Sequence, residues 1–219
     1  MDKLLITIDG PAGAGKTTVS RALADRLGYR YIDTGALYRA VALAAKTHGI
    51  DPENDAELKG LCAELELEFV LVEAGLRLLL NGKDITDHIR TAEITMLASA
   101  ISARPIVRGY LLDLQRNLGK EKAAVFEGRD MGTVVFPGAD LKFFLDATTR
   151  TRALRRYDEI KSQSTQTLAE VDQDIQRRDR NDSTRELAPL KPAQDAIVID
   201  STDLSVAEVV ELMVSHIVD

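Results

Sequence analysis

The fold of this 219-residue sequence is decided by one stretch near its start, Gly10-Pro11-Ala12-Gly13-Ala14-Gly15-Lys16-Thr17. It fits the pattern G-x-x-x-x-G-K-[ST], whose glycines let the backbone turn its N–H groups toward phosphate oxygens. Lys16 adds a mobile positive charge at the β- and γ-phosphates, and Thr17 offers a hydroxyl to Mg²⁺. A β-type run, 4–8, precedes the motif and a helical run, 17–27, follows it. This context favours a loop that binds a nucleoside triphosphate over a chance glycine-rich turn.

Outside this loop, short apolar runs alternate with helical segments, a pattern typical of an α/β fold with a parallel sheet. The expected strands are 4–8, 29–33, 123–126, 141–145 and 196–199. The expected helices are 17–27 closed by Gly28, 34–48 closed by Gly49, 148–161, one from the capping box Thr167–Glu170, and one from Ser205. Thr34 is expected to cap the second helix.

The middle of the chain has a different pattern, which predicts a small antiparallel sheet inserted into the core. Strands are expected at 67–72 and 76–80, joined by Glu73-Ala74-Gly75. Asn81-Gly82 predicts a type I′ turn into a short strand at Ile85. Helices are expected at 55–65, at 91–103 and, beginning with Pro105, at 105–118.

Composition limits the classes of function. The formal net charge of −7 argues against broad nucleic-acid binding, which needs a basic face, but allows a small polyanion to bind at local arginine clusters. Cys62 is the only cysteine, the N-terminus lacks the features of a signal peptide, and no run reaches the roughly 20 apolar residues of a membrane span. We therefore expect a cytoplasmic protein with no membrane partner.

Charged residues follow two of the predicted strands, and ligands of open α/β sheets bind at the carboxyl ends of strands. Asp33, Thr34 and Arg39 follow the second strand, and Glu127-Gly128-Arg129-Asp130 follows the third. Arginine suits two-point binding of a phosphate. The alternatives are a helix cap with a solvated arginine in the first case and a surface salt bridge in the second.

Two arginine-rich helices joined by the polar break Ser162-Gln163-Ser164 resemble a mobile lid. The arginines are Arg150, Arg152, Arg155 and Arg156 on the first helix, and Arg177, Arg178, Arg180 and Arg185 on or after the second. If the second helix persists, Arg178, Asp182 and Arg185 share one face. The alternative is a solvated helix face with ion pairs.

Taken together, these blocks make the chain resemble the bacterial cytidylate kinases, a family of nucleoside monophosphate kinases. The resemblance covers nearly the whole length and is carried by residues 8–16, 33–39, 128–137 and 178–190. It implies a three-layer P-loop fold with a central five-stranded parallel sheet in the order 2-3-1-4-5. It also implies a core of 1–34, 105–150 and 190–219, a nucleoside-monophosphate-binding insertion of about 35–104, and a helical lid of about 151–189.

The same resemblance implies roles for individual residues. Lys16, Arg129 and Arg185 are the expected catalytic residues. ATP is expected on Gly10, Pro11, Ala12, Gly13, Ala14, Gly15, Lys16, Thr17 and Thr18, with Mg²⁺ at Thr17. Thr34, Arg39, Arg129 and Arg185 are expected at the acceptor phosphate. Ser99, Arg108 and Asp130 are expected at the cytosine ring, and Tyr38, Arg178 and Asp182 near the sugar.

The function expected from the resemblance is transfer of the γ-phosphoryl group of ATP to CMP or dCMP by a monomer. The phosphate loop alone leaves other acceptors open, such as UMP, shikimate or dephospho-coenzyme A. It also leaves open a nucleotide-switched binding module with no acceptor at all.

Overall fold

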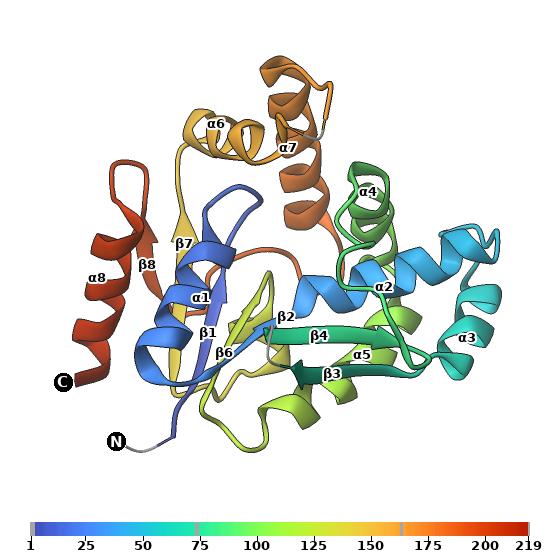
Figure 1. The fold of residues 1–219 in the computed structure, drawn as a ribbon, viewed down its shortest axis with the longest axis horizontal. Helices are drawn as coiled ribbons and strands as arrows, with labels where there is room; N and C mark the ends of the chain where they lie inside the picture. The colour runs from blue at the N-terminus through green and yellow to red at the C-terminus, as the bar shows by residue number, and fades with distance from the viewer. Residues whose placement is uncertain (1–2, 73–74, 163, 219) are drawn as a thin grey trace. The chain divides into compact units, whose positions relative to one another are not determined.

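The computed structural model describes residues 3–72, 75–162 and 164–218, which form two compact units (Figure 1). The first, here the P-loop unit, comprises 1–32 and 119–219, and the second, the hairpin unit, comprises 33–118.

The P-loop unit is built on a five-stranded sheet in the order β2-β6-β1-β7-β8. The strands are β1 (Leu5–Asp9), β2 (Arg30–Asp33), β6 (Ala124–Gly128), β7 (Leu141–Asp146) and β8 (Ile197–Asp200). β1 pairs in parallel with β6 and β7, and β7 pairs in parallel with β8. Numbered among themselves along the chain, these five strands stand in the order 2-3-1-4-5, so the predicted α/β topology is confirmed.

The central strand β1 and its neighbour β6 are continuous buried runs, as is typical of strands in a parallel α/β sheet. Every residue of β1 and of β6 is buried. Ile6 and Phe143 share one core with Leu23 of α1 (Lys16–Leu27) and Met213 of α8 (Val206–Val218). The sheet therefore holds the end of β1, where the phosphate loop begins, in a rigid frame.

Helices α6 (Thr149–Ile160) and α7 (Leu168–Thr184) form a small helical pair in the same unit. In Figure 1 the pair lies above the carboxyl ends of β1 and β7. Its own core is Ala153, Val171 and Ile175. The predicted capping box of Thr167 is present, but α7 ends at Thr184, so the predicted helical face does not extend to Arg185.

The hairpin unit contains α2 (Thr34–Thr47), α3 (Asp55–Glu64), β3 (Leu67–Val72), β4 (Gly75–Leu80), β5 (Lys83–Asp84), α4 (Ala92–Ile101) and α5 (Pro105–Gly119). The three strands form an antiparallel sheet in the order β3-β4-β5, as predicted. Leu37 and Val41 of α2, Leu78 of β4 and Leu111 of α5 are fully buried in one core. α2 thus has its own apolar support, independent of the P-loop unit.

In the hairpin unit the predicted turn after β4 is confirmed, whereas the predicted strand at Ile85 and the predicted cap of α2 are wrong. Asn81 (φ 48°) and Gly82 (φ 76°) both have positive φ, as a type I′ turn requires. However, the strand after the turn is Lys83–Asp84 and stops before Ile85. The cap of α2 is Asp33 and not Thr34, because the Asp33 carboxylate accepts the Ala36 N–H at 3.0 Å.

A few observed elements differ in length from the predicted ones, and some predicted residues lie outside the described part of the chain. β6 runs two residues beyond the predicted 126, because Glu127 and Gly128 pair with the last residues of β1. A single turn of π-helix, Met131–Val135, follows it and was not predicted. Glu73 and Ala74 of the predicted strand link, and Gln163 of the polar break, lie outside the described residues.

Candidate active site

The phosphate loop between β1 and α1 needs glycine at two positions for steric reasons. Gly10 has φ +149°, and a Cβ there would stand 2.0 Å from the Leu145 carbonyl oxygen. At Gly13 (φ +76°) a Cβ would stand 2.7 Å from the Arg152 carbonyl oxygen. The loop therefore lies against β7 and α6 so closely that no side chain fits, and its backbone is left to face a ligand.

Lys16, the first residue of α1, is buried, with 5% of its surface exposed. Its Nζ donates a hydrogen bond to the Pro11 carbonyl oxygen at 2.7 Å. Burial, and then the positive charges of Arg129 and Arg178, lower the pKa of Lys16 to about 7, although Glu127 and Asp9 oppose the shift. An ammonium held in such surroundings is strongly favoured when an anion arrives beside it.

Glu127, a carboxylate with no individually predicted role, connects the loop to β2 through two hydroxyl groups. Its Oε1 accepts from Thr17 Oγ1 at 2.9 Å, and its Oε2 accepts from the Tyr31 hydroxyl at 2.6 Å. The register of β6 beside β1 brings Glu127 level with Ile8. The available signal was an acidic residue at the end of a buried strand adjacent to the loop strand.

Asp9, the last residue of β1, is a second carboxylate that was not predicted. Its side chain accepts the backbone N–H groups of Met131 at 2.9 Å and Gly132 at 2.8 Å. Burial raises the pKa of Asp9 to about 6, against the effect of these two amides. Asp9 therefore anchors the π-helical turn that directly follows Arg129 and Asp130.

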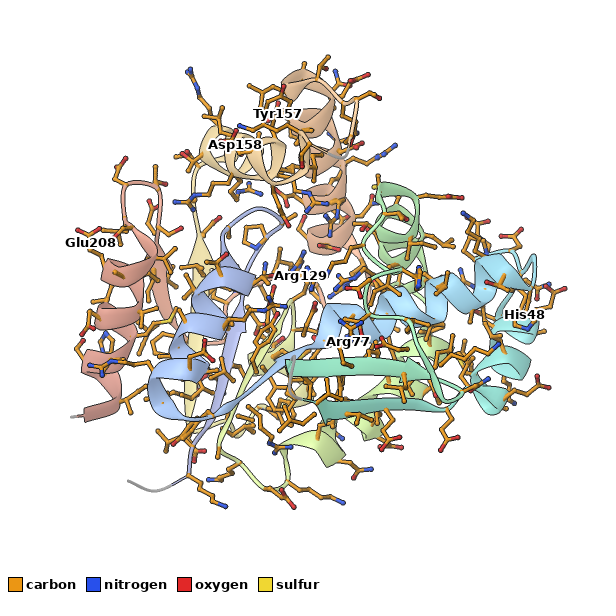
Figure 2. All side chains as sticks on the ribbon, in the orientation of Figure 1. His48, Arg77, Arg129, Tyr157, Asp158 and Glu208 are labelled. Atoms are coloured by element: carbon orange, nitrogen blue, oxygen red, sulfur yellow. The ribbon has the colours of Figure 1, made fainter. Side chains whose placement is uncertain are left out.

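Four of the predicted site residues meet at the end of β6 and the C-terminal end of α7. Arg129 Nε donates to Asp182 Oδ2 at 2.9 Å, and Arg185 Nη2 lies 3.4 Å from Asp130 Oδ1. Burial raises the pKa of Asp182, but Arg129 and the neighbouring arginines outweigh it and hold the pKa below its usual value. Figure 2 shows Arg129 below the C-terminal end of α7. Arg178 is near enough to lower the pKa of both Lys16 and Asp182.

Two arginines of α6 bind the backbone of the phosphate loop. Arg152 Nη1 donates to the Ala12 carbonyl oxygen at 3.1 Å and to Asp179 Oδ2 of α7 at 2.6 Å. Arg155 Nη1 donates to the Ala14 carbonyl oxygen of the loop at 3.4 Å and to Ser201 Oγ at 2.9 Å. α6 is thus connected to the loop on one side and to α7 on the other.

Other arginines of the two helices serve local ion pairs instead. Arg156 pairs with Glu159 and Arg177 pairs with Asp174, each three residues away on its own helix. These two residues follow the alternative of a solvated helix face. Thr18, in the first turn of α1, is exposed.

The remaining predicted residues lie in the hairpin unit, on α2, α4 and α5. The Arg108 guanidinium stands 5.7 Å from the centre of the Tyr38 ring and donates to the Ser102 carbonyl oxygen at 3.1 Å. Ser102 Oγ in turn donates to the Ser99 carbonyl oxygen at 2.8 Å. The structure therefore brings Tyr38, Ser99 and Arg108 into one neighbourhood.

At the start of α2, Arg39 Nη2 donates to Asp33 Oδ2 at 2.6 Å. Burial raises the pKa of Asp33, but Arg39 and then Arg90 outweigh it, so the pKa lies below its usual value. Thr34, the first residue of the helix, is buried. Arg90 was not predicted, because nothing in its local sequence marks it.

Across residues 3–72, 75–162 and 164–218, no helix has the length and apolar character needed to cross a membrane.

Comparisons with known proteins match one family over nearly the whole chain. The family model described as cytidylate kinase matches residues 6–219. The cytidylate kinase of Geobacter sulfurreducens is 54% identical over 213 residues, covering 97% of this chain and 91% of that protein. That of Pseudomonas aeruginosa PAO1 is 48% identical over 219 residues, covering 97% and 94%. A crystal structure of shikimate kinase from Bacteroides thetaiotaomicron has a TM-score of 0.52 at 14% identity, with 99% of each chain covered, and shares the fold alone.

Proposed function

This chain belongs to the cytidylate kinase family, and we propose from that premise that it transfers the γ-phosphoryl group of ATP to CMP or dCMP, giving CDP or dCDP. The observation that carries the proposal is the family match over nearly the whole chain, joined to a complete phosphate loop with a buried lysine. A nucleotide-switched module without an acceptor would not require the second cluster of arginines and carboxylates around Arg129.

In this reaction the side chains position the two nucleotides and neutralise the charge of the phosphates. The acceptor phosphate oxygen is already a nucleophile near neutral pH, so no strong general base is needed. We propose that the loop N–H groups and Lys16 hold the donor phosphates, while Arg129 and Arg185 face the charge that develops on the transferring group. The pairs of these arginines with Asp182 and Asp130 preorganise them, so little reorientation is needed during the reaction.

Mg²⁺ fits the oxygen groups at the start of α1. The Thr17 hydroxyl and the Glu127 carboxylate lie 2.9 Å apart, and both are the hard oxygen ligands that this ion prefers. We propose that Thr17 holds the ion together with the donor phosphates, with Glu127 orienting the hydroxyl. When bound, Mg²⁺ neutralises charge on the β- and γ-phosphates.

For the acceptor, we propose that the hairpin unit supplies Thr34 and Arg39 to the phosphate, Tyr38 to the sugar, and Ser99 and Arg108 to the cytosine ring. Ser99 supports this, because its Oγ is buried and has no hydrogen-bond partner among the described residues. A buried hydroxyl without a partner costs free energy unless a ligand satisfies it.

From the P-loop unit we propose that Arg129 and Arg185 bind the acceptor phosphate, Asp130 the base, and Arg178 and Asp182 the sugar. We also propose that residues 151–189 act as the lid, 35–104 as the monophosphate-binding insertion, and 1–34, 105–150 and 190–219 as the core. The separate small core of α6 and α7 supports the lid. A cytoplasmic monomer that binds no nucleic acid is the form in which we propose it acts.

A coupled assay of ADP release across candidate acceptors tests the function. We expect strong turnover with CMP and dCMP and little with AMP, GMP, shikimate or dephospho-coenzyme A. Turnover with Lys16→Ala should fall by several orders of magnitude while the fold is kept. Slow hydrolysis of ATP that no acceptor accelerates would refute the proposal and favour a switch module.

A further inference from the structure

We propose that Arg90 binds the phosphate group of the acceptor nucleotide, in partnership with Arg39, and that Asp33 orients both guanidinium groups for this purpose. The identity of the acceptor rests on the function proposed above. All three residues belong to the hairpin unit.

The geometry that carries the inference is the convergence of two guanidinium groups on one carboxylate oxygen. Asp33 Oδ2 accepts from Arg39 Nη2 at 2.6 Å and lies 3.3 Å from Arg90 Nη2. Arg90 reaches this oxygen from 57 residues away, out of the segment between β5 and α4. The other oxygen, Oδ1, accepts the Ala36 N–H and caps α2. One carboxylate thus brings two separate parts of the unit to the same point.

The charges at this point do not balance. Two guanidinium groups remain charged at every physiological pH, while Asp33 supplies a single negative charge. The lowered pKa of Asp33 keeps it ionised, so the local sum is one positive charge. The N-terminus of α2, a helix of 14 residues, adds partial positive charge in the same place. A phosphate monoester, which carries close to two negative charges above its second pKa of about 6, compensates this excess.

Arg90 also has donors to spare and a route for a ligand to reach them. An arginine has five N–H donors, and one carboxylate oxygen accepts only a few of them. The Arg90 side chain is 46% exposed, whereas Arg39 is 17% exposed. Arg39 Nε is buried with no hydrogen-bond partner among the described residues. If the contact served only the fold, Arg39 alone would be enough to pair with Asp33. A second arginine at the same carboxylate is better explained by a ligand.

The test compares ligands that differ only in the phosphate. Dissociation constants of CMP and of cytidine, which lacks the phosphate, are measured by calorimetry for the wild type and Arg90→Gln. We expect Arg90→Gln to weaken CMP about tenfold or more, as for loss of a charge-assisted hydrogen bond, and to leave cytidine unchanged. Inorganic phosphate should compete with CMP less well in this variant. Arg90→Lys should recover part of the loss, since it keeps the charge but not the planar fork.

Arg104→Gln is the matched control in the same unit. Arg104 also bridges two segments through one aspartate, Asp55, which opens α3. Figure 1 shows α3 at the C-terminal end of α2, a helix of 14 residues that is about 21 Å long, whereas Asp33 stands at its N-terminal end. This variant should bind CMP like the wild type.

Two outcomes would overturn the assignment of Arg90. Equal weakening of CMP and cytidine would make Arg90 a structural strut, and unchanged binding of CMP would remove it from the site. The same series includes turnover of the wild type with CMP. Absence of that turnover would refute the proposed function, whereas turnover with an unaltered CMP affinity in Arg90→Gln would refute only the role of Arg90.

Discussion

Binding of ATP is expected to draw a proton from solvent onto Lys16. The pKa of this buried amine is lowered to about 7, first by burial and then by Arg129 and Arg178. At pH 8 a group of that pKa is neutral in about nine of ten molecules, and at pH 6 in about one of ten. The donor phosphates add several negative charges beside Nζ and favour the ammonium form again. The expected uptake on Lys16 is therefore about 0.9 proton per ATP at pH 8 and about 0.1 at pH 6.

Calorimetry in buffers of different ionisation enthalpy measures this number directly, because the observed binding enthalpy changes with the buffer in proportion to the protons taken up. The titration is best done at pH 8 with magnesium present, where the terminal phosphate of ATP is already ionised and exchanges few protons itself. Lys16→Arg is the matched control. Its guanidinium stays charged throughout, so the buffer dependence should be lost even if ATP still binds.

A wild-type binding enthalpy that does not vary with buffer at pH 8 would contradict proton uptake by Lys16. Uptake by Lys16 would also be refuted if Lys16→Arg bound ATP with the same proton uptake as the wild type, since the proton would then belong to another group. An uptake that grows as the pH falls toward 6 would have the wrong sign for a lysine of lowered pKa.

Three further changes have outcomes that unfolding in urea can measure. Gly10→Ala should destabilise the protein by about 2–4 kcal/mol, because its Cβ would stand 2.0 Å from the Leu145 carbonyl oxygen on a backbone of φ +149°. Asp9 is 4% exposed and has its pKa raised from 3.8 to about 6, so its own contribution to stability should be greatest below pH 4 and fall by up to about 3 kcal/mol as the pH rises through 6. The difference in stability between the wild type and Asp9→Asn isolates this contribution, because Asp33 and Asp182, whose pKa values are lowered, are present in both. Asp9→Asn should remove this part of the pH dependence. Arg129→Met should cost about 3 kcal/mol by removing the arginine that donates a hydrogen bond to the buried Asp182, and Asp182→Leu in the same chain should restore most of it.

Each change has a control within the chain. Gly138→Ala should stay within about 0.5 kcal/mol of the wild type and keep its pH dependence, because a Cβ there meets no described atom within 4 Å. Arg156→Met breaks an ion pair with Glu159, whose side chain is 60% exposed, and should cost no more than about 1 kcal/mol. Equal losses at Gly10 and Gly138, or at Arg129 and Arg156, would contradict the steric and burial arguments. An equal change of stability with pH in the wild type and in Asp9→Asn would contradict the role of Asp9.

Most local features were predictable because their causes lie within a few residues. Gly28 ends α1 with φ +66°, and Thr167 and Glu170 form their capping box three residues apart. The predicted topology also held, since a phosphate loop after a buried strand, followed by alternating strands and helices, leaves few ways to build the sheet.

The sequence was not sufficient to predict which of two similar residues makes a given contact. Asp33 and Thr34 are both good capping residues, and the choice of Asp33 depends on its orientation at the end of β2. Likewise, Arg156 and Arg152 look alike in the same helix. Of these two, Arg152 donates to the phosphate loop and to Asp179 of the neighbouring helix, whereas Arg156 pairs with Glu159 on its own helix.

The phosphate loop is predictable from local sequence, because the glycines, the lysine and the hydroxyl that it needs are adjacent in the chain. The charges that surround the loop depend on tertiary contacts. Thr17 meets Glu127 from 110 residues away, and Asp9 reaches the amide of Gly132 from 123 residues away. Arg90 reaches Asp33 across 57 residues. Such pairs depend on strand register and helix packing, which bring together carboxylates and cations whose local sequences do not mark them as partners.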